Sequence, residues 1–317
     1  MLSGSPLFNG DAGSGPSNIR RWLFERDFID CIVKLPTEIF FRTGISTYIW
    51  ILSNKKPVNR RGLIQLIDAS SKRVPLKKNL GNKRYEISDE QIDWITRTYV
   101  DGHDHGNSVI VPATEFMFRQ VSTRQPLRMN IVLDATKTDE FFKHSKPMSK
   151  IMAEDREAIQ VWFMSHDGET HDYAWAYTAT KELGKLMRNN KPSKGQFVKA
   201  IVDVFGVRSS EADFAVDEKG VKVYDGELKD TENIPWGMSF DEYMSKEVLP
   251  YAPESEIDVN VKDSGPLQDG QVGVVGTSIN FNRYFYEYEE PRDPKEIAKE
   301  ILELEDGLEL FMKGFLQ

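Results

Sequence analysis

Hydrophobic positions in residues 19–56 change their spacing and predict a helix followed by two strands. Ile19, Trp22 and Leu23 recur at helical spacing, whereas residues 29–35 and 45–52 are short apolar runs rich in β-branched residues. Neither run alternates cleanly between apolar and polar positions, which is typical of strands covered on both faces of a sheet. Such strands belong in the middle of an α/β sheet, so we expect this stretch to be the last part of a larger fold.

The following pattern predicts the edge of that sheet. Residues 63–68 read as a strand, and we expect them to pair with residues 45–52 as an antiparallel hairpin at the end of a mainly parallel sheet. Residues 1–18 read as a loop. Ser88, with Gln91 three residues later, predicts a capping box for a helix that runs to Tyr99.

From about residue 136 the pattern becomes mainly helical. Helices are expected over 148–163 and 173–188, and a third begins after Ser193 and stops at Gly206. A loop is expected at 230–236, residues 253–276 are polar and glycine-rich, and residues 280–289 read as an extended aromatic segment. We therefore expect three parts, with bounds 1–135, 136–292 (mainly helical with short strands) and 293–317.

The last part is predicted to be a helix with a narrow apolar seam. Asp293 is placed to cap it and Pro294 stands at its first position. Apolar residues then recur at spacings of 4, 3, 4, 3 and 4, the pattern of a coiled-coil seam: Ile297, Ile301, Leu304, Leu308, Phe311 and Phe315. Either a partner helix covers this seam or the helix folds back on the chain's own helical region.

The net charge of −9 conceals two unlike halves. Residues 1–135 hold 19 Lys and Arg against 14 Asp and Glu, whereas the rest holds 22 against 36. Residues 55–84 alone contain ten basic residues and one acid, Asp68. A local basic field within an acidic chain is typical of a nucleic-acid face, although a solvated surface has the same composition.

Few residues support chemistry within the chain itself. There is no glycine-rich phosphate loop after a strand, and the single cysteine, Cys31, lies in an apolar run that indicates a structural role. His103 and His105 could suggest a metal site, but no third ligand accompanies them, so we expect an exposed loop and no metal. Without a leader or an apolar run of spanning length, we expect a cytoplasmic protein and no membrane partner.

Several strings resemble the modification (M) subunits of type I restriction–modification systems, an adenine-N6 DNA methyltransferase family. They are GSPLFNGDAGSGPSNIRRWL, IVKLPTEIFFRTGISTYIWILSNKK, LKKNLGNKRYEISDEQIDWITRTYVDG, FRQVSTRQPLRMN, ELKDTENIP, EVLP and FNRYFYEYEEPRDPKEIAKEI. The resemblance runs discontinuously from residue 4 to about residue 305. One departure is VVGTSINFNRYF, where the family has a shorter lead containing glycine and tyrosine.

This resemblance implies DNA adenine-N6 methylation with S-adenosylmethionine, but in a longer chain. The family's glycine-containing cofactor loop and its Asn-Pro-Pro-aromatic motif do not occur here. We therefore expect the C-terminal portion of a subunit: the incomplete tail of a Rossmann-like sheet, followed by a mainly α-helical region. Alone it is expected to be inactive, with no catalytic residues and no bound cofactor. The implied partners are DNA and the specificity and restriction subunits.

The resemblance also implies roles for individual residues. Phe40 matches an aromatic residue that packs on the extruded target base, although Phe40 could equally fill the core beneath its turn. Arg42, Thr43 and Gly44 follow at the same edge, where Arg42 could meet a phosphate and Gly44 could ease a turn or a close approach. Further phosphate contacts are expected from the basic stretch: Lys77, Lys78, Lys83 and Arg84. The apolar seam is then expected to join the specificity subunit. The alternative is a non-catalytic module that binds that subunit or DNA.

Overall fold

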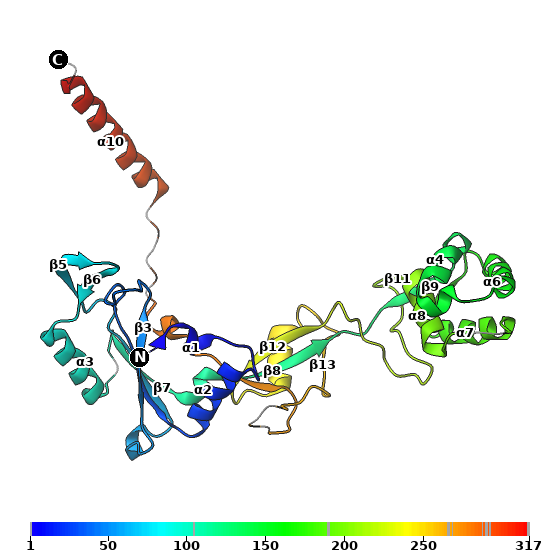
Figure 1. The fold of residues 1–317 in the computed structure, drawn as a ribbon, viewed down its shortest axis with the longest axis horizontal. Coiled ribbons are helices and arrows are strands. Elements are labelled where there is room, and N and C mark those ends of the chain that lie inside the picture. The colour runs from blue at the N-terminus through cyan, green and yellow to red at the C-terminus, as the bar shows by residue number, and fades with distance from the viewer. Residues whose placement is uncertain are drawn as a thin grey trace.

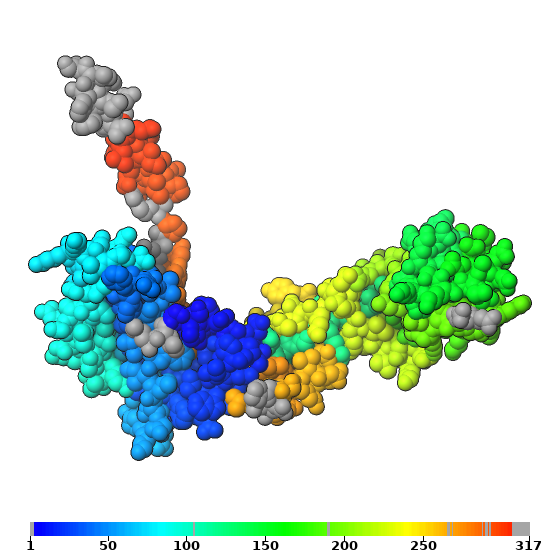
Figure 2. Space-filling model, in the orientation of Figure 1, coloured from blue at the N-terminus to red at the C-terminus, as the bar shows by residue number. Residues whose placement is uncertain are grey.

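The chain folds into mixed sheets and helices arranged along one long axis (Figures 1 and 2). The computed structural model describes residues 2–103, 105–188, 191–264, 267, 269–286, 288, 291 and 293–315, and the side chains of residues 306–315 lie outside that description. Among the described residues, no helix is both long and apolar enough to cross a bilayer.

The first sheet has five strands in the order β1-β3-β2-β4-β7. They are β1 (Leu2–Ser3), β2 (Ile29–Lys34), β3 (Thr47–Leu52), β4 (Leu63–Asp68) and β7 (Ser108–Pro112). Only β2 and β4 run parallel, and the other neighbours are antiparallel. The expected hairpin between residues 45–52 and 63–68 is therefore wrong, as is the mainly parallel sheet. Strand β2 lies between these two, because its side chains are the most completely buried.

Strand β2 is covered on both faces, as its apolar run predicts. Ile29 and Ile32 pack into one hydrophobic cluster, whereas Cys31 and Val33 pack into another on the opposite face. Burial raises the pKa of the Cys31 thiol far above its usual range, which agrees with a structural role. The second cluster extends under α3 and includes Trp94.

Helices and a hairpin surround this sheet. Residues 1–18 are not the expected loop, because they include β1, α1 (Ser5–Phe8) and the start of α2 (Gly15–Glu25). The capping box at Ser88 is confirmed, since the Ser88 amide donates to Gln91 Oε1 at 3.0 Å at the start of α3 (Asp89–Asp101). The remaining elements of this part are short: η1 (Val58–Arg60), β5 (Val74–Leu80), β6 (Lys83–Glu86) and η2 (Ala113–Phe116).

A second sheet is built around β8 (Met117–Arg124). Residues 230–236, expected to be a loop, form its neighbour β12 (Asp230–Pro235), and the polar residues 253–276 supply two more partners, β13 (Glu256–Ile257) and β14 (Val274–Thr277). The loop expected at 230–236 is therefore wrong. A short helix α9 (Phe240–Tyr243) and the π turn η4 (Met244–Val248) connect these strands.

Residues between β8 and β12 form a separate helical bundle (Figure 1). Its core cluster is drawn entirely from residues 131–205 and includes Phe141, Phe163 and Phe205. Ser193 accepts the Gln196 amide at 3.4 Å and begins α8, which ends at Gly206 as predicted. The bundle contains β9 (Met129–Val132), η3 (Ala135–Lys137), α4 (Thr138–Lys143), α5 (Lys146–Ser149), α6 (Ala153–Ser165), β10 (Thr170–Asp172), α7 (Trp175–Leu186), α8 (Lys194–Phe205) and β11 (Gly206–Arg208).

The C-terminal residues return to the first sheet before they leave it again. Val275, Ile279 and Phe281 join the cluster that contains Leu7 and Phe24. Residues 281–284 form a 3-10 helix, η5 (Phe281–Tyr284), so the expected extended segment is wrong there. Helix α10 (Pro294–Phe315) then projects away from the body (Figure 1). The three domain bounds stay a prediction.

Candidate nucleic-acid interface

The turn over residues 35–46 joins β2 to β3 at the carboxyl end of β2. Strand β4 runs parallel to β2 and ends at the same edge, with Lys34 paired with Asp68 in the register. In open α/β sheets, ligands bind outside the carboxyl ends of parallel strands. The turn therefore lies at the carboxyl ends of the one parallel pair in the described sheet.

Hairpin β5–β6 packs directly against this turn. The backbone amide of Arg84 donates to the Glu38 carbonyl at 2.9 Å, and the Arg84 guanidinium lies 3.3 Å from the Glu38 carboxylate. At the hairpin tip, the Asn82 amide donates to the Phe41 carbonyl at 3.4 Å. Two segments that the sequence suggested separately thus form one surface.

Two unusual backbone positions hold this contact together. Glu38 has a φ of 58°, which is uncommon for a residue with a side chain and is found where the surroundings impose it. Gly81 has a φ of 60°, and a β-carbon there would come within 3.2 Å of the Phe41 carbonyl oxygen. Gly81 therefore requires glycine for two reasons, its left-handed backbone and the close approach of a carbonyl. Gly44 has no left-handed φ, and a β-carbon there would have Glu38 Cγ as its nearest neighbour, at 4.0 Å.

The basic side chains of the hairpin face solvent. Lys77, Lys78 and Arg84 are exposed, and Lys83 is half-buried. Lys77 and Lys78 are consecutive in β5, so their side chains leave opposite faces of the ribbon. The cations therefore surround the hairpin instead of lining one of its faces.

Arg73 is a contact that sequence reasoning did not single out. Its guanidinium lies 3.8 Å from the centroid of the Tyr85 ring, and its Nη1 donates to Thr37 Oγ1 at 3.2 Å. Thr37 belongs to the turn, and Tyr85 belongs to the hairpin. A possible signal was its position just before β5, within the basic stretch.

The two phenylalanines of the turn have different surroundings. Phe40 is half-buried and packs against the cluster that contains Leu35 and Ile39. Phe41 is 61% exposed. Arg42 is exposed beside it, and Thr43 forms an isolated β-bridge with Phe40. Of the two rings, only that of Phe41 is mostly free of protein contacts.

A second group that the sequence analysis missed lies next to the turn. Lys34 Nζ donates to Asn282 Oδ1 at 3.2 Å and lies 3.5 Å from Asp68 Oδ2. Asn282 comes from η5, so the C-terminal segment reaches the carboxyl ends of β2 and β4. No local pattern could have indicated this contact, because 248 residues separate its two partners.

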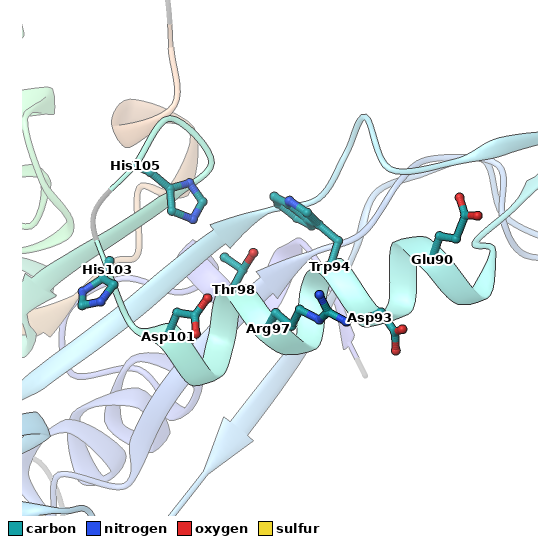
Figure 3. A pocket seen from close by; sticks show the side chains of 8 residues that line it. All are labelled: Glu90, Asp93, Trp94, Arg97, Thr98, Asp101, His103 and His105. Carbon is teal, nitrogen blue, oxygen red and sulfur yellow. The ribbon is translucent and has the colours of Figure 1, made fainter.

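A separate hollow of about 580 Å³ lies along helix α3 (Figure 3). Six residues along the helix and two histidines beyond its end line it: Glu90, Asp93, Trp94, Arg97, Thr98, Asp101, His103 and His105. Both histidines are exposed. Within the described ranges, which omit Asp104, no group of three His, Cys, Asp or Glu is arranged to hold a metal ion.

The predicted seam of α10 is solvent-exposed as far as the structure describes it. Ile297, Ile301 and Leu304 are 41%, 55% and 73% exposed. The side chains of Leu308, Phe311 and Phe315 lie outside the described residues. The helix does not fold back over its described half, so this part of the seam is available to a partner.

Comparison with known proteins finds similarity to DNA methylases over the first part of the chain. The family model "N-6 DNA Methylase" matches residues 3–110. The methylase subunit of the type I restriction enzyme MjaVIII from Methanocaldococcus jannaschii is 31% identical over 104 residues, which cover 33% of this chain and 17% of that protein. The MpnII methylase subunit from Mycoplasma pneumoniae is 38% identical over 61 residues, 19% of this chain and 11% of that protein.

One solved structure is also similar to part of this chain. The methyltransferase subunit of the type I restriction–modification system from Streptococcus thermophilus is 29% identical, with a TM-score of 0.31, over 36% of this chain and 22% of that chain. The matches span less than a fifth of the length of the curated relatives. Residues 3–110 thus match the N-6 DNA methylase model, and parts of the chain are similar to methylase subunits of type I restriction enzymes.

Proposed function

We propose that this chain is the C-terminal portion of a type I M subunit and that it presents a DNA-facing surface. That surface consists of the turn over residues 35–46 and the β5–β6 hairpin. The observation that carries the proposal is the contact between Glu38 and Arg84, which joins the turn to the basic hairpin. The similarity to methylase subunits supports DNA as the negatively charged partner of this basic surface.

Each part of the surface has a chemical task in this proposal. Lys77, Lys78, Lys83 and Arg84 neutralise phosphates without reading sequence, and Arg42 adds a charge beside the exposed Phe41. An aromatic ring at the turn stacks on an extruded adenine, which offsets the cost of unstacking it. Phe40 was the residue assigned by resemblance, and the exposure of Phe41 makes it the second candidate.

Methylation itself is assigned to the complete subunit. S-adenosylmethionine would bind residues that this sequence does not contain, and the present chain would support the reaction by holding DNA and the specificity subunit. The exposed half of the α10 seam supports the latter role. The restriction subunit, the cytoplasmic location and the lack of cofactor binding by the chain alone stay predictions.

The test of the DNA surface is the salt dependence of duplex binding, measured by fluorescence anisotropy. Replacing Lys77, Lys78, Lys83 and Arg84 with Gln should lower the slope of log K against log salt by about 0.9 for each cation that contacts a phosphate, and by about 3.6 at most. A charge-matched control carries Gln at four other exposed lysines: Lys219, Lys229, Lys246 and Lys295. An equal fall in both variants would mean that net charge alone governs binding and would refute the surface.

The alternative is a non-catalytic module that binds a partner or DNA independently of any methylase. Isothermal calorimetry with S-adenosylmethionine separates the two in part. Tight binding by the chain alone would contradict the view that the cofactor residues lie elsewhere. Restoration of methyl transfer by a chain supplying the missing motifs would favour the subunit over the module.

A further inference from the structure

The helical bundle carries a second strongly charged surface, far from the hairpin. Residues 174–199 contain six Lys and Arg and one acid, Glu182, whereas residues 153–172 contain six acids and one basic residue, Arg156. The two stretches correspond largely to α7 with the start of α8, and to α6 with β10. Charge is therefore separated within one bundle that is almost neutral as a whole.

The cations of the first stretch gather around α7. Lys181 and Lys185 are exposed and lie four residues apart in α7, so they share one side of the helix, and the exposed Arg188 follows shortly after the helix ends at Leu186. The other side of α7 is buried through Ala176, Ala179 and Leu183. Since the apolar side of α7 fills the core, its basic side faces solvent.

The connection to α8 adds two further cations to the same side. Lys191 Nζ donates to the Gly184 carbonyl at 2.7 Å, which places it beside Lys185. Lys194 Nζ lies 5.6 Å from the centroid of the Tyr177 ring and pairs with Glu218. An aromatic ring is thus set among the cations, as in surfaces that contact nucleic-acid backbones and bases.

Most of this charge is left without a carboxylate partner. In the part of the chain that the structure describes, Lys181, Lys185 and Arg188 have no carboxylate oxygen within ion-pair distance, although Lys181 is near enough to Glu218 to help lower the pKa of that carboxyl. Asp155 accepts the backbone amide of Arg188, at 3.3 Å. Glu182 and Glu218 reduce the excess but do not balance five cations. We infer that the α7 surface, Lys181, Lys185, Arg188, Lys191 and Lys194, binds the phosphate backbone of a nucleic acid.

The position of this surface gives it a use that the hairpin cannot provide. Figure 1 shows α7 at one end of the molecule and β5–β6 at the other, with the β8–β12 sheet between them. Two phosphate-binding surfaces at opposite ends would hold a nucleic acid over a longer stretch than either surface alone. The inference depends only on the charge of the bundle, although it extends the proposed function.

The experiment compares three double variants of the full chain by anisotropy with a duplex long enough to reach both ends. They are Lys181→Gln with Lys185→Gln, Lys77→Gln with Lys78→Gln, and the charge-matched control Lys229→Gln with Lys246→Gln. The α7 pair should lower the salt slope by about 1.8, and the control should leave it within error. If only the hairpin pair acts, the α7 inference is overturned and the proposed function stands. If only the α7 pair lowers the salt slope, the hairpin surface of the proposed function is refuted and the α7 inference stands.

A second probe tests the class of partner. Labelled polyglutamate replaces DNA in the same assay, because an acidic polypeptide would also suit these cations. Tight binding of polyglutamate that the α7 variant abolishes, with an unchanged DNA slope, would overturn the inference. Lys185 lies in the last turn of α7 and interacts favourably with the helix dipole, so the α7 variant should show a small fall in Tm. This fall in Tm does not affect the salt slope.

Discussion

The Arg20 guanidinium binds Thr277 twice, although 257 residues separate them. Nε donates to Thr277 Oγ1 at 3.1 Å, and Nη2 donates to the Thr277 carbonyl at 2.6 Å. Nη1 donates to the carbonyls of Pro6 and Asn9. Arg20 is 2% exposed and has no carboxylate among these partners, so burial lowers its pKa. This one side chain ties α2 to α1 and its C-cap residue Asn9 and to strand β14.

Replacing Arg20 with Met should therefore destabilise the first part of the chain markedly. The carbonyls of Pro6, Asn9 and Thr277 would lose their donors, and each unsatisfied buried group costs about 1–3 kcal/mol, part of which water recovers. We expect a loss of about 3 kcal/mol in the free energy of unfolding, measured by urea denaturation. Arg26→Met is the control, because Arg26 is exposed on the same helix end. Equal losses in both variants would contradict the view that the hydrogen bonds of Arg20 stabilise this part of the chain.

Tyr99 should make stability fall at high pH. Burial, and then the hydrogen bond that its hydroxyl donates to Asp30 at 2.5 Å, raise the pKa of Tyr99 to about 12. Because the folded chain holds this proton more tightly than the unfolded chain, the stabilisation is fully present below about pH 10 and is lost as pH rises through about 12.

The comparison with Tyr99→Phe isolates this contribution. The pKa of Tyr243 is also raised to about 12, but Tyr243 is present in both proteins and cancels in the difference. Urea unfolding at a series of pH values should show a shallower decline for the variant above about pH 10. Parallel curves would mean that Tyr99 titrates normally.

Phe40 and Phe41 should differ in what their removal costs. Phe40→Ala deletes a ring packed against Leu35 and Ile39, so the free energy of unfolding should fall by about 2 kcal/mol. Phe41→Ala should change it by less than about 0.5 kcal/mol, because that ring is mostly exposed. Chemical denaturation of both variants decides between them.

The same pair then separates core filling from base stacking. In a reconstituted subunit, a 2-aminopurine at the target position reports stacking by its fluorescence. A change confined to the Phe41 variant would move the stacking role from Phe40 to Phe41. If neither variant alters the fluorescence, the turn does not stack on a base.

The seam of α10 should be required for partner binding and not for folding. Ile301→Lys with Leu304→Lys places charges on two exposed positions, so the Tm should stay within about 2 °C of the parent value. Co-purification with a specificity subunit should be lost. The control, Lys299→Gln with Glu303→Gln, changes an exposed ion pair on the same helix. A large fall in Tm would instead indicate that the helix packs within its own chain.

Local features followed from the sequence because their causes are local. The capping boxes at Ser88 and Ser193 depend on hydrogen bonds over three residues, and both form. The two-sided burial of β2 followed from an apolar run without alternation, because both faces of such a strand must be covered.

The candidate surface was predictable in its parts and not in its assembly. The basic stretch and the turn were both visible in the sequence, but their contact through Glu38 and Arg84 was not. Arg73 and Asn282 escaped attention because their partners are fixed by long-range packing. The α7 surface differs, because its cations lie close together in the sequence, between residues 181 and 194, and only the burial of the apolar side of α7 in the bundle shows that they face solvent.

The sequence by itself determined which segments are apolar on one or both faces, where helices begin, and that residues 3–110 resemble N-6 DNA methylases. Only the tertiary structure decided which strands are neighbours. Residues 230–235 read as polar loop, yet they become a strand because β8 offers them an unpaired edge. Strand β3 pairs with β2 instead of β4 because burying β2 between two neighbours removes more apolar surface from water. Such choices depend on the sum of distant contacts, and no local spacing encodes that sum.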